Sequence, residues 1–289
     1  MNLDAILKPG ARAVITGAAG GIGLAAAELC ARRGMKVVLA DLPGEALEHA
    51  RDAVAAAATS SGDVIAFPTD VADFAQVQSL QARVAEAFGA APNLLMNNAG
   101  VGLNPGGAAK DLAGWRRLMD VNLWGAIHGV QAFLPSMTEA AAPALIINTG
   151  SKQGLTSPPG NAAYNVSKAA LKTYTEALAH ELRNRPGAEA ITAHLLIPGF
   201  TFTGMTSRPG ADPAAKPPAA WTPEQVIDFM LESLARDDFY ILCPDNDVAR
   251  ATDERRLAWA MGDIIENRPA LSRWHPAWKD RFEAFMARD

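Results

Sequence analysis

Three polar residues in the middle of the chain, Ser151, Tyr164 and Lys168, have types and spacing that suit acid–base chemistry. Tyr164 and Lys168 lie four residues apart in a segment of helical composition, so they would share one face of a helix. An ammonium group close to a phenol favours the phenolate and lowers the tyrosine pKa from about 10 toward neutrality. Such a tyrosine can take a proton from an alcohol or give one to a ketone, while Ser151 binds the same oxygen.

The chemistry that suits this group is hydride transfer, in which an oxygen loses or gains a proton as a hydride moves to or from a nicotinamide. A tyrosine and a lysine one turn apart also occur on ordinary helix surfaces. The interpretation therefore depends on the elements that position the three residues.

Short apolar runs alternate with long segments rich in Ala, Leu, Glu and Arg. The runs are continuous, which predicts strands buried on both faces: Ala13–Thr16, Val37–Ala40, Val64–Phe67, Leu94–Met96, Ala144–Asn148 and Ile191–Ile197. The segments between them predict helices: Gly21–Arg33, Gly44–Thr59, Phe74–Phe88, Leu112–Ala140 and Ala162–Arg183. Strand–helix repetition predicts an α/β fold with a doubly wound, Rossmann-type parallel sheet flanked by helices. A further helix, Glu224–Ala235, and a last strand, Phe239–Leu242, complete it.

The first strand runs directly into a glycine-rich turn, and a helix follows. Gly17, Gly21, Ile22 and Gly23 form this turn, which lets the backbone approach a pyrophosphate. Because the glycine spacing differs from the standard dinucleotide fingerprint, a plain tight turn remains an alternative at this point.

Asp41 ends the second strand, where a carboxylate can accept hydrogen bonds from both adenosine ribose hydroxyls. The same carboxylate would repel a 2′-phosphate, and Leu42, Pro43 and Gly44 offer no basic side chain to bind one. We therefore predict NAD as the cofactor rather than NADP. The alternative is that Asp41 caps the next helix.

These features together resemble the short-chain dehydrogenase/reductase family over nearly the whole of residues 1–205. The matching elements are the glycine turn, Asp70-Val71 after the third strand, Asn97-Asn98-Ala99-Gly100 after the fourth, Asn122 in a helix, the Ser151, Tyr164 and Lys168 set, and Pro198-Gly199 followed by Thr201 and Thr203. Their order and spacing fit the family, and no catalytic position departs from it.

The resemblance implies a role for each matching residue. The implied catalytic residues are Asn122, Ser151, Tyr164 and Lys168, with Asn122 kinking its helix and holding a water that relays protons. The implied cofactor-binding residues are Gly17, Gly21, Ile22, Gly23, Asp41, Asp70, Val71, Asn98, Tyr164, Lys168, Pro198, Gly199, Thr201 and Thr203. No metal site is expected.

The segments that border the substrate in this family are mainly apolar here. They contribute Val101, Leu103, Leu155, Pro158, Pro159, Phe200, Phe202 and Met205. We therefore expect an oxidoreductase that transfers a hydride between NAD(H) and a hydrophobic or aromatic secondary alcohol or ketone. The alternatives are an NADPH-dependent carbonyl reductase and a non-catalytic nucleotide-binding protein of the same fold.

The chain of 289 residues exceeds the minimal family pattern. Residues 1–244 are expected to form one Rossmann-type catalytic domain, with a substrate loop at 203–220. Residues 245–289 then form a helical C-terminal extension that carries Trp259, Trp274 and Trp278, with Leu257, Met261, Ile264 and Ile265 on one side of a helix. This extension is expected to pack at a subunit interface of a homodimer or homotetramer, or alternatively to fold back on its own domain.

Charge and cysteine content narrow the partners. The 26 basic and 31 acidic side chains give a net charge of −5, which argues against nucleic-acid binding. The two cysteines, Cys30 and Cys243, stand far apart, which excludes a disulfide scaffold and fits a reducing, cytoplasmic location. No signal peptide or membrane span is expected, because no apolar stretch is long and uninterrupted enough.

Overall fold

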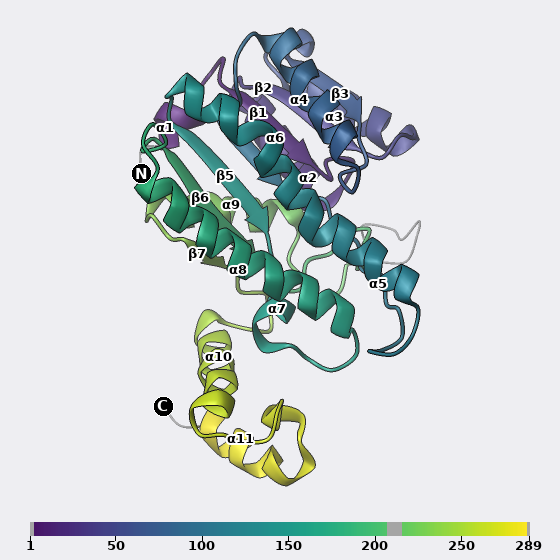
Figure 1. Ribbon diagram of the computed structural model, residues 1–289, viewed down its shortest axis with the longest axis vertical. Helices are drawn as coiled ribbons and strands as arrows, with labels where there is room; N and C mark the ends of the chain where they lie inside the picture. Colours follow the sequence, from purple (N-terminus) through teal and green to yellow (C-terminus); the bar gives the residue numbers. More distant parts are fainter. Residues whose placement is uncertain (1–2, 207–215, 288–289) are drawn as a thin grey trace.

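The computed structural model describes residues 3–206 and 216–287, and these contain a seven-stranded parallel sheet (Figure 1). The strand order is β3-β2-β1-β4-β5-β6-β7. The strands are β1 Arg12–Thr16, β2 Lys36–Asp41, β3 Val64–Pro68, β4 Leu94–Asn97, β5 Ala144–Thr149, β6 Ile191–Ile197 and β7 Tyr240–Leu242. The order reverses between β1 and β4, so the carboxyl ends of these strands border a crevice of the kind that binds ligands. The predicted doubly wound α/β fold is confirmed.

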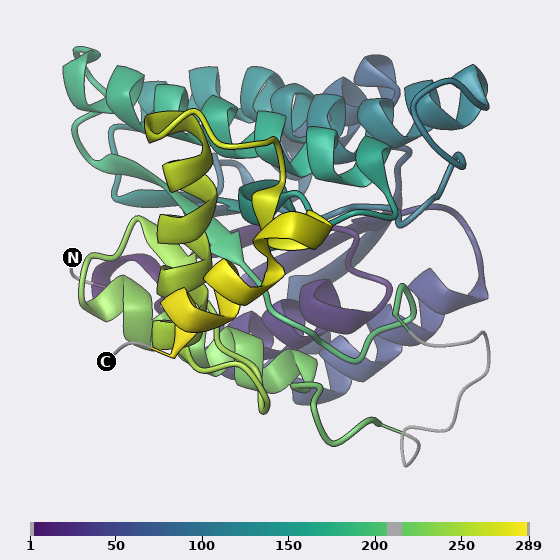
Figure 2. The ribbon, with the colours of Figure 1, turned by 90° about the horizontal axis from the view of Figure 1, so that it is seen from below.

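Two layers of helices cover the sheet, which explains why the strand sequences are apolar without alternation (Figure 2). The bounds of the helices on one face are α2 Gly21–Arg32, α3 Glu45–Ala57 and α9 Pro223–Ala235, and those on the other are α4 Phe74–Phe88, α5 Leu112–Met119, α6 Gly125–Ala140 and α8 Ala162–Asn184. Adjacent residues of β1 belong to different cores: Ile15 packs with the α2 layer and Val14 with the α6 layer. Both side chains are fully buried.

The segment predicted as one helix, 112–140, is interrupted. Between α5 and α6 the backbone forms a π-helical turn, Asp120–Trp124, which contains the buried Asn122. A π-turn inserts an extra residue into the helix and often marks a functional site. The family resemblance implied a kink at Asn122, and the structure has a π-helical turn at this residue.

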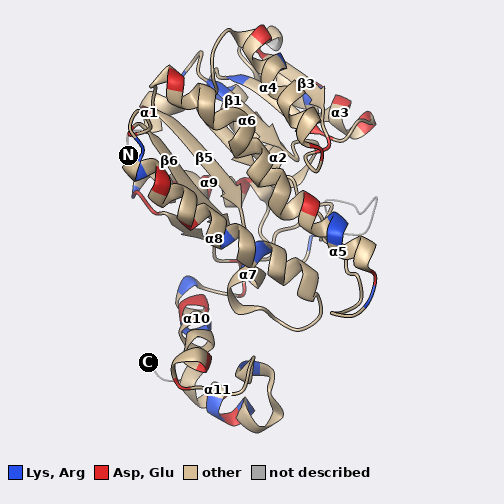
Figure 3. Ribbon diagram, viewed as in Figure 1, with Lys and Arg blue, Asp and Glu red and all other residues tan. Residues whose placement is uncertain are grey.

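The extension begins after β7 and leaves the domain beside the short helix α7, Gln153–Thr156 (Figure 1). Its helices are α10 Arg250–Ile265 and α11 Lys279–Met286, joined by 3₁₀ turns at Ser272–Trp274 and Pro276–Trp278. A short helix α1, Leu3–Ile6, and a 3₁₀ turn at Ser61–Asp63 complete the described elements. Lysines, arginines and carboxylates are mixed along α10 and α11 rather than segregated by sign (Figure 3).

The extension has a small aromatic core of its own. Trp259 is only 5% exposed and packs edge-on against Phe282 and Trp278, while the guanidinium of Arg268 stacks on its ring at 4.1 Å. Two of the three tryptophans that suggested a partner surface are thus used within the extension. Within the described ranges, no helix is long and apolar enough to cross a membrane.

Candidate active site

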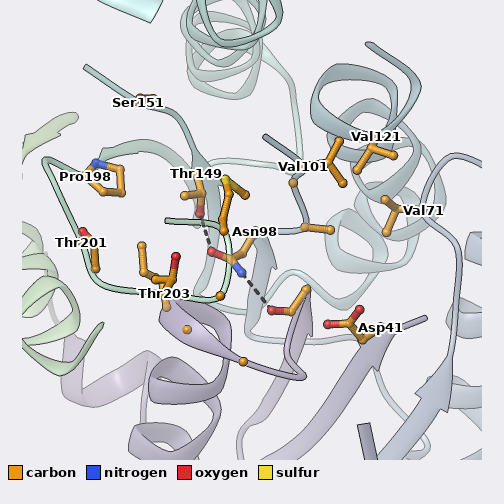
Figure 4. A pocket seen from close by; sticks show the side chains of 18 of the residues that line it. Asp41, Val71, Asn98, Val101, Val121, Thr149, Ser151, Pro198, Thr201 and Thr203 are labelled. Atoms are coloured by element: carbon orange, nitrogen blue, oxygen red, sulfur yellow. Dashed lines mark hydrogen bonds between the residues drawn. The ribbon is translucent and has the colours of Figure 1, made fainter. Parts of the chain in front are cut away.

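A cavity of about 350 Å³ lies at the carboxyl edge of the sheet, between the glycine turn and the segment after β6. Its lining includes most of the residues that the sequence assigned to a cofactor or to catalysis: Gly17, Gly21, Ile22, Asp41, Asp70, Val71, Asn98, Ser151, Tyr164, Lys168, Pro198, Gly199, Thr201 and Thr203. Gly23 and Asn122 lie behind this wall. Asp41 and Ser151 stand at opposite ends of the view in Figure 4.

Two glycines of the turn, Gly17 and Gly23, have no room for a side chain. Gly17 has a φ of +65°, and a Cβ on it would lie 2.7 Å from Cα of Ala99. A Cβ on Gly23 would lie 2.2 Å from the carbonyl oxygen of Gly17. The residue before α2, Gly20, offers no side-chain cap, so the first N–H groups of α2 remain available to a phosphate. These features fit the pyrophosphate of a dinucleotide and account for the nonstandard glycine spacing.

The end of β4 is joined to this turn by hydrogen bonds. The Asn98 side chain donates to the carbonyl oxygens of Thr16 and Gly17, both at 3.2 Å, and accepts from Thr149 Oγ1 at 3.2 Å (Figure 4). The backbone N–H groups of Asn98 and Ala99 donate to Thr16 Oγ1 at 3.0 and 3.1 Å. Asn98 therefore fixes the relative positions of β1, β4 and β5 at the cavity.

Asp41 does not cap the next helix, because the residue before α3 is Gly44. Its carboxylate instead accepts hydrogen bonds from the backbone N–H groups of Ala19 and Leu42, both at 2.8 Å. The carboxylate is thus held against the glycine turn and borders the cavity. The helix-cap alternative is wrong, and a position suited to ribose hydroxyls remains.

Asp70 and Val71 lie at the same end of the cavity as Asp41. The Asp70 carboxylate accepts from the N–H of Ala72 at 3.0 Å and pairs with Arg117 at 2.9 Å. Arg117 also lines the cavity, and nothing in the sequence pattern distinguished it from a solvated helix arginine. The ion pair with Asp70 balances the positive charge of Arg117.

The residues predicted to be catalytic come together at the other end of the cavity. Asn161 begins α8 by accepting a hydrogen bond from Tyr164 N, and Lys168 Nζ donates to the carbonyl oxygen of Thr149 at 2.7 Å. Lys168 Nζ lies 5.7 Å from the centre of the Tyr164 ring. Ser151 is the polar neighbour that lowers the pKa of Tyr164. The helix α8 therefore presents both side chains to the cavity, as their spacing predicted.

The electrostatics differ in one respect from the expectation. Burial raises the pKa of Tyr164, and Ser151 lowers it only in part. Burial also lowers the pKa of Lys168 to about 8. The Lys168 ammonium donates to the Thr149 carbonyl oxygen and does not offset the desolvation of the phenol. Without a cofactor, Tyr164 is therefore in its protonated, acid form at neutral pH.

Comparison with known proteins agrees with this geometry. The family model described as short chain dehydrogenase matches residues 11–214. The 1-deoxy-11-beta-hydroxypentalenate dehydrogenase of Streptomyces exfoliatus is 32% identical over 266 residues, which cover 91% of this chain and 93% of that protein. The chain belongs to the short-chain dehydrogenase/reductase family.

Other members of the family support the same assignment. The D-beta-hydroxybutyrate dehydrogenase of Rhizobium meliloti is 32% identical over 218 residues, covering 75% of this chain and 80% of that protein. A short-chain dehydrogenase/reductase from Burkholderia phymatum in complex with NAD superposes with a TM-score of 0.78 at 35% identity, covering 90% of this chain and 96% of that one. A metagenomic short-chain oxidoreductase in complex with NADP gives a TM-score of 0.65 at 28% identity, with coverages of 82% and 98%. This short-chain dehydrogenase is thus an oxidoreductase with a nicotinamide cofactor.

In this short-chain dehydrogenase, Asn122 is 1% exposed and ties the π-turn to the loop after β4. Its Oδ1 accepts from Val101 N at 2.8 Å, and its Nδ2 donates to the Val101 carbonyl at 3.0 Å and to Ser167 Oγ at 3.2 Å. These hydrogen bonds of Asn122 therefore hold the π-turn in place against the loop after β4 and against α8. The implied proton relay through a water remains a prediction.

An ion cluster behind Ser151 was not predicted from the sequence. Lys152 Nζ lies 2.5 Å from Asp253 Oδ2 and 3.3 Å from Asp245 Oδ2, and all three side chains are at most 18% exposed. Asp245 also accepts from the backbone N–H of Phe200 at 3.3 Å, next to Gly199. The cluster joins the extension to both sides of the catalytic end. Its members lie too far apart in sequence for any local pattern to indicate the contact.

The residues expected around the substrate do not all face one space. Val101 and Met205 line the cavity just described, whereas Leu155 and Pro158 line a second one beside the extension. Leu103 and Phe200 are 43% and 40% exposed. The predicted loop 203–220 lies in part outside the described residues.

Proposed function

We propose that the protein transfers a hydride between NAD(H) and a hydrophobic or aromatic secondary alcohol or its ketone. The observation that carries this proposal is the meeting of Ser151, Tyr164 and Lys168 at one end of a cavity whose other end holds the glycine turn and Asp41. A binding protein without turnover would not need a buried acid–base tyrosine beside a serine.

The preference for NAD rests on Asp41. A 2′-phosphate on the adenosine ribose would place its charge beside a carboxylate already fixed by Ala19 and Leu42. Arg117 is the cation on the same cavity that could favour an NADPH-dependent reductase. Its pairing with Asp70 at 2.9 Å makes it a weaker attraction than a free arginine would be. NAD is also the cofactor of the Burkholderia phymatum structure.

The bound nicotinamide would supply the hydride acceptor or donor at the catalytic end. Tyr164 gives its phenolic proton to a ketone oxygen as a hydride reaches the carbon, or takes the hydroxyl proton of an alcohol in the reverse direction. Ser151 holds the same oxygen by a hydrogen bond. Lys168 would bind the nicotinamide ribose, and its link to the Thr149 carbonyl fixes the ammonium for this task.

The substrate class follows from the apolar residues beside the catalytic end. Val101 and Met205 line the cavity, so a substrate with an apolar body would be desolvated favourably. A panel of aryl and alkyl secondary alcohols and ketones, followed by the absorbance of NADH, should give turnover with apolar substrates and little with polyols. Absence of turnover across the panel with both NAD and NADP would overturn the proposal.

We place the protein in the cytoplasm, where thiols stay reduced. Cys30 and Cys243 are both free and buried, and burial raises the pKa of each thiol to about 12. Such thiols are inert hydrophobic side chains, in keeping with a reducing compartment.

We infer further that the protein is a homodimer or homotetramer and that the extension contributes to the subunit interface. Leu257 packs on the domain beside Leu195, Ile197 and Leu242, but the later apolar residues of α10 extend beyond it. Met261, Ile264 and Ile265 are 56%, 76% and 76% exposed. Three neighbouring exposed apolar side chains on one helix favour burial against another subunit.

Replacing Ile264 and Ile265 by Asp should lower the mass of the particle in solution, because two carboxylates would have to be desolvated at the interface. Light scattering measures the change, with Glu266→Gln on the same turn as a matched control. A full-length protein that is already monomeric would overturn the assembly and leave the extension packed only on its own domain.

A further inference from the structure

A second cavity, of about 280 Å³, lies between α7 and the extension. Leu155, Pro158, Leu242, Leu257 and Trp274 give it an apolar wall. The charged side chains that line it are Lys152, Asp253, Arg256 and Arg273. The cavity is thus apolar with a cationic side.

The cations in this cavity outnumber the carboxylates that could pair with them. Asp253 lies 2.5 Å from Lys152, and its other oxygen is 3.6 Å from Arg256. Even with Asp245 behind Lys152, two carboxylates serve the three cations Lys152, Arg256 and Arg273. One positive charge is therefore left over beside the cavity.

Arg256 and Arg273 also have N–H donors that are not used in hydrogen bonds or ion pairs among the described residues. Nε of Arg256 is buried and has no hydrogen-bond partner among the described residues. The guanidinium of Arg273 stacks on the rings of Trp274, at 4.8 Å, and Phe282, at 5.2 Å, and makes no ion pair within the described part of the chain. A buried donor without a partner is costly, and a carboxylate is the partner that arginine binds best.

The second cavity begins close to the catalytic serine. The N–H of Gln153, which lines the cavity, donates to Ser151 Oγ at 3.2 Å. Helix α7 lies between α8 and α10 (Figure 1), and its Gly154 is packed so tightly that a Cβ there would lie 2.6 Å from the Lys168 backbone. The linings of the two cavities therefore adjoin at Ser151 and Gln153.

We propose that a long substrate extends from Ser151 past Gln153 into the second cavity and that Arg256 and Arg273 bind a carboxylate at its far end, so that the preferred substrates are apolar or aromatic alcohols and ketones that carry an acid group. This inference rests on the proposed function and adds to it the identity of the substrate's distal group. The apolar wall receives the body of the molecule, and stacking on Trp274 and Phe282 holds Arg273 in place for the acid.

The test compares ketones that differ only in charge. The probes are 4-acetylbenzoate and the longer 4′-acetylbiphenyl-4-carboxylate, each paired with its neutral carboxamide, and kcat and KM are measured with NADH. For at least one length the acid should exceed its amide by about tenfold or more in kcat/KM, through a lower KM. Arg256→Gln and Arg273→Gln should each remove most of this preference and leave the amides within about twofold of the original enzyme.

Two control variants separate a specific contact from a general charge effect. Arg250→Gln removes one positive charge from the start of the same helix at an exposed pair with Glu254, and should change nothing. Arg256→Lys keeps the charge but loses the planar fork, and should restore part of the preference. Equal values for acid and amide at both lengths, or an acid preference that survives both glutamine variants, would overturn the proposal.

A binding measurement keeps this inference distinct from the proposed function. If none of the four ketones is turned over, the proposed reaction fails, and calorimetric titration with biphenyl-4-carboxylate then decides the carboxylate site alone. Binding that is lost in Arg256→Gln but kept in Arg250→Gln would support the site. No binding by the unaltered protein would overturn it.

Discussion

Tyr164→Phe should reduce turnover by about 10²–10⁴-fold, the range that a general acid–base group contributes. The ring keeps its place on α8, because Asn161 caps the helix through the backbone N–H of residue 164 and not through the phenol. NADH binding, measured by fluorescence titration, should therefore stay within a few fold of the original. Steady-state kinetics with an aryl ketone would show the loss in kcat.

The pH profile adds a signature that a packing defect cannot imitate. Because burial raises the pKa of Tyr164, the phenol stays protonated near neutrality and must lose its proton before it can act as a base. Alcohol oxidation should thus accelerate as the pH rises, and Tyr164→Phe should lack this rise. A variant that kept more than about a tenth of the activity would assign the proton transfer to another group.

Asp41 should govern the choice of cofactor by several kcal/mol, because a like-charge contact at a partly dry site carries a cost of that order. The original protein should use NAD far better than NADP in kcat/KM. Asp41→Ala should narrow the difference mainly by improving NADP. The loss of the bond to Ala19 N will also loosen the glycine turn, so some NAD affinity should be lost as well.

Asp41→Asn tests the charge separately, because the amide oxygen can still accept from Ala19 while the negative charge is gone. It should gain NADP activity with a smaller loss of NAD affinity than the alanine variant. Equal kcat/KM for the two cofactors in the original protein would contradict this assignment. Arg117→Gln, at the same end of the cavity, should weaken whatever NADP activity is present.

The strands could be predicted because each is a continuous apolar run buried between two helix layers. Ala144–Asn148, for example, was expected and Ala144–Thr149 is found. The proximity of Tyr164 and Lys168 could be predicted because the two residues lie one turn apart on α8. Both predictions use only the spacing of residues within a single helix or strand, and this spacing can be read directly from the sequence.

Features that depend on distant partners could not be predicted from the residues alone. The π-turn at Asp120–Trp124 has ordinary helix composition, and its Asn122 is held by Val101, which lies on another loop. Trp259 looked like a partner-facing side chain, but its neighbours Phe282 and Phe285 come from a helix that turns back on it. Leu155 and Pro158 were expected beside the substrate, but their position in a second cavity next to the extension could not be read from the sequence.

The ion pairs of Lys152 also determine which contacts can form early and which can form late while the chain is being synthesised. Lys152 and Asp245 are 93 positions apart, and Asp253 is farther still, so their contacts close only after all strands of the sheet have been synthesised. The glycine turn, β1, β2 and β4 all emerge much earlier. A nascent chain halted before Asp245 would thus already contain the glycine turn and the strands beside it. It would lack the carboxylates that pair with Lys152 behind Ser151. All residues that line the cofactor cavity are therefore synthesised before the contacts that hold Lys152 can form.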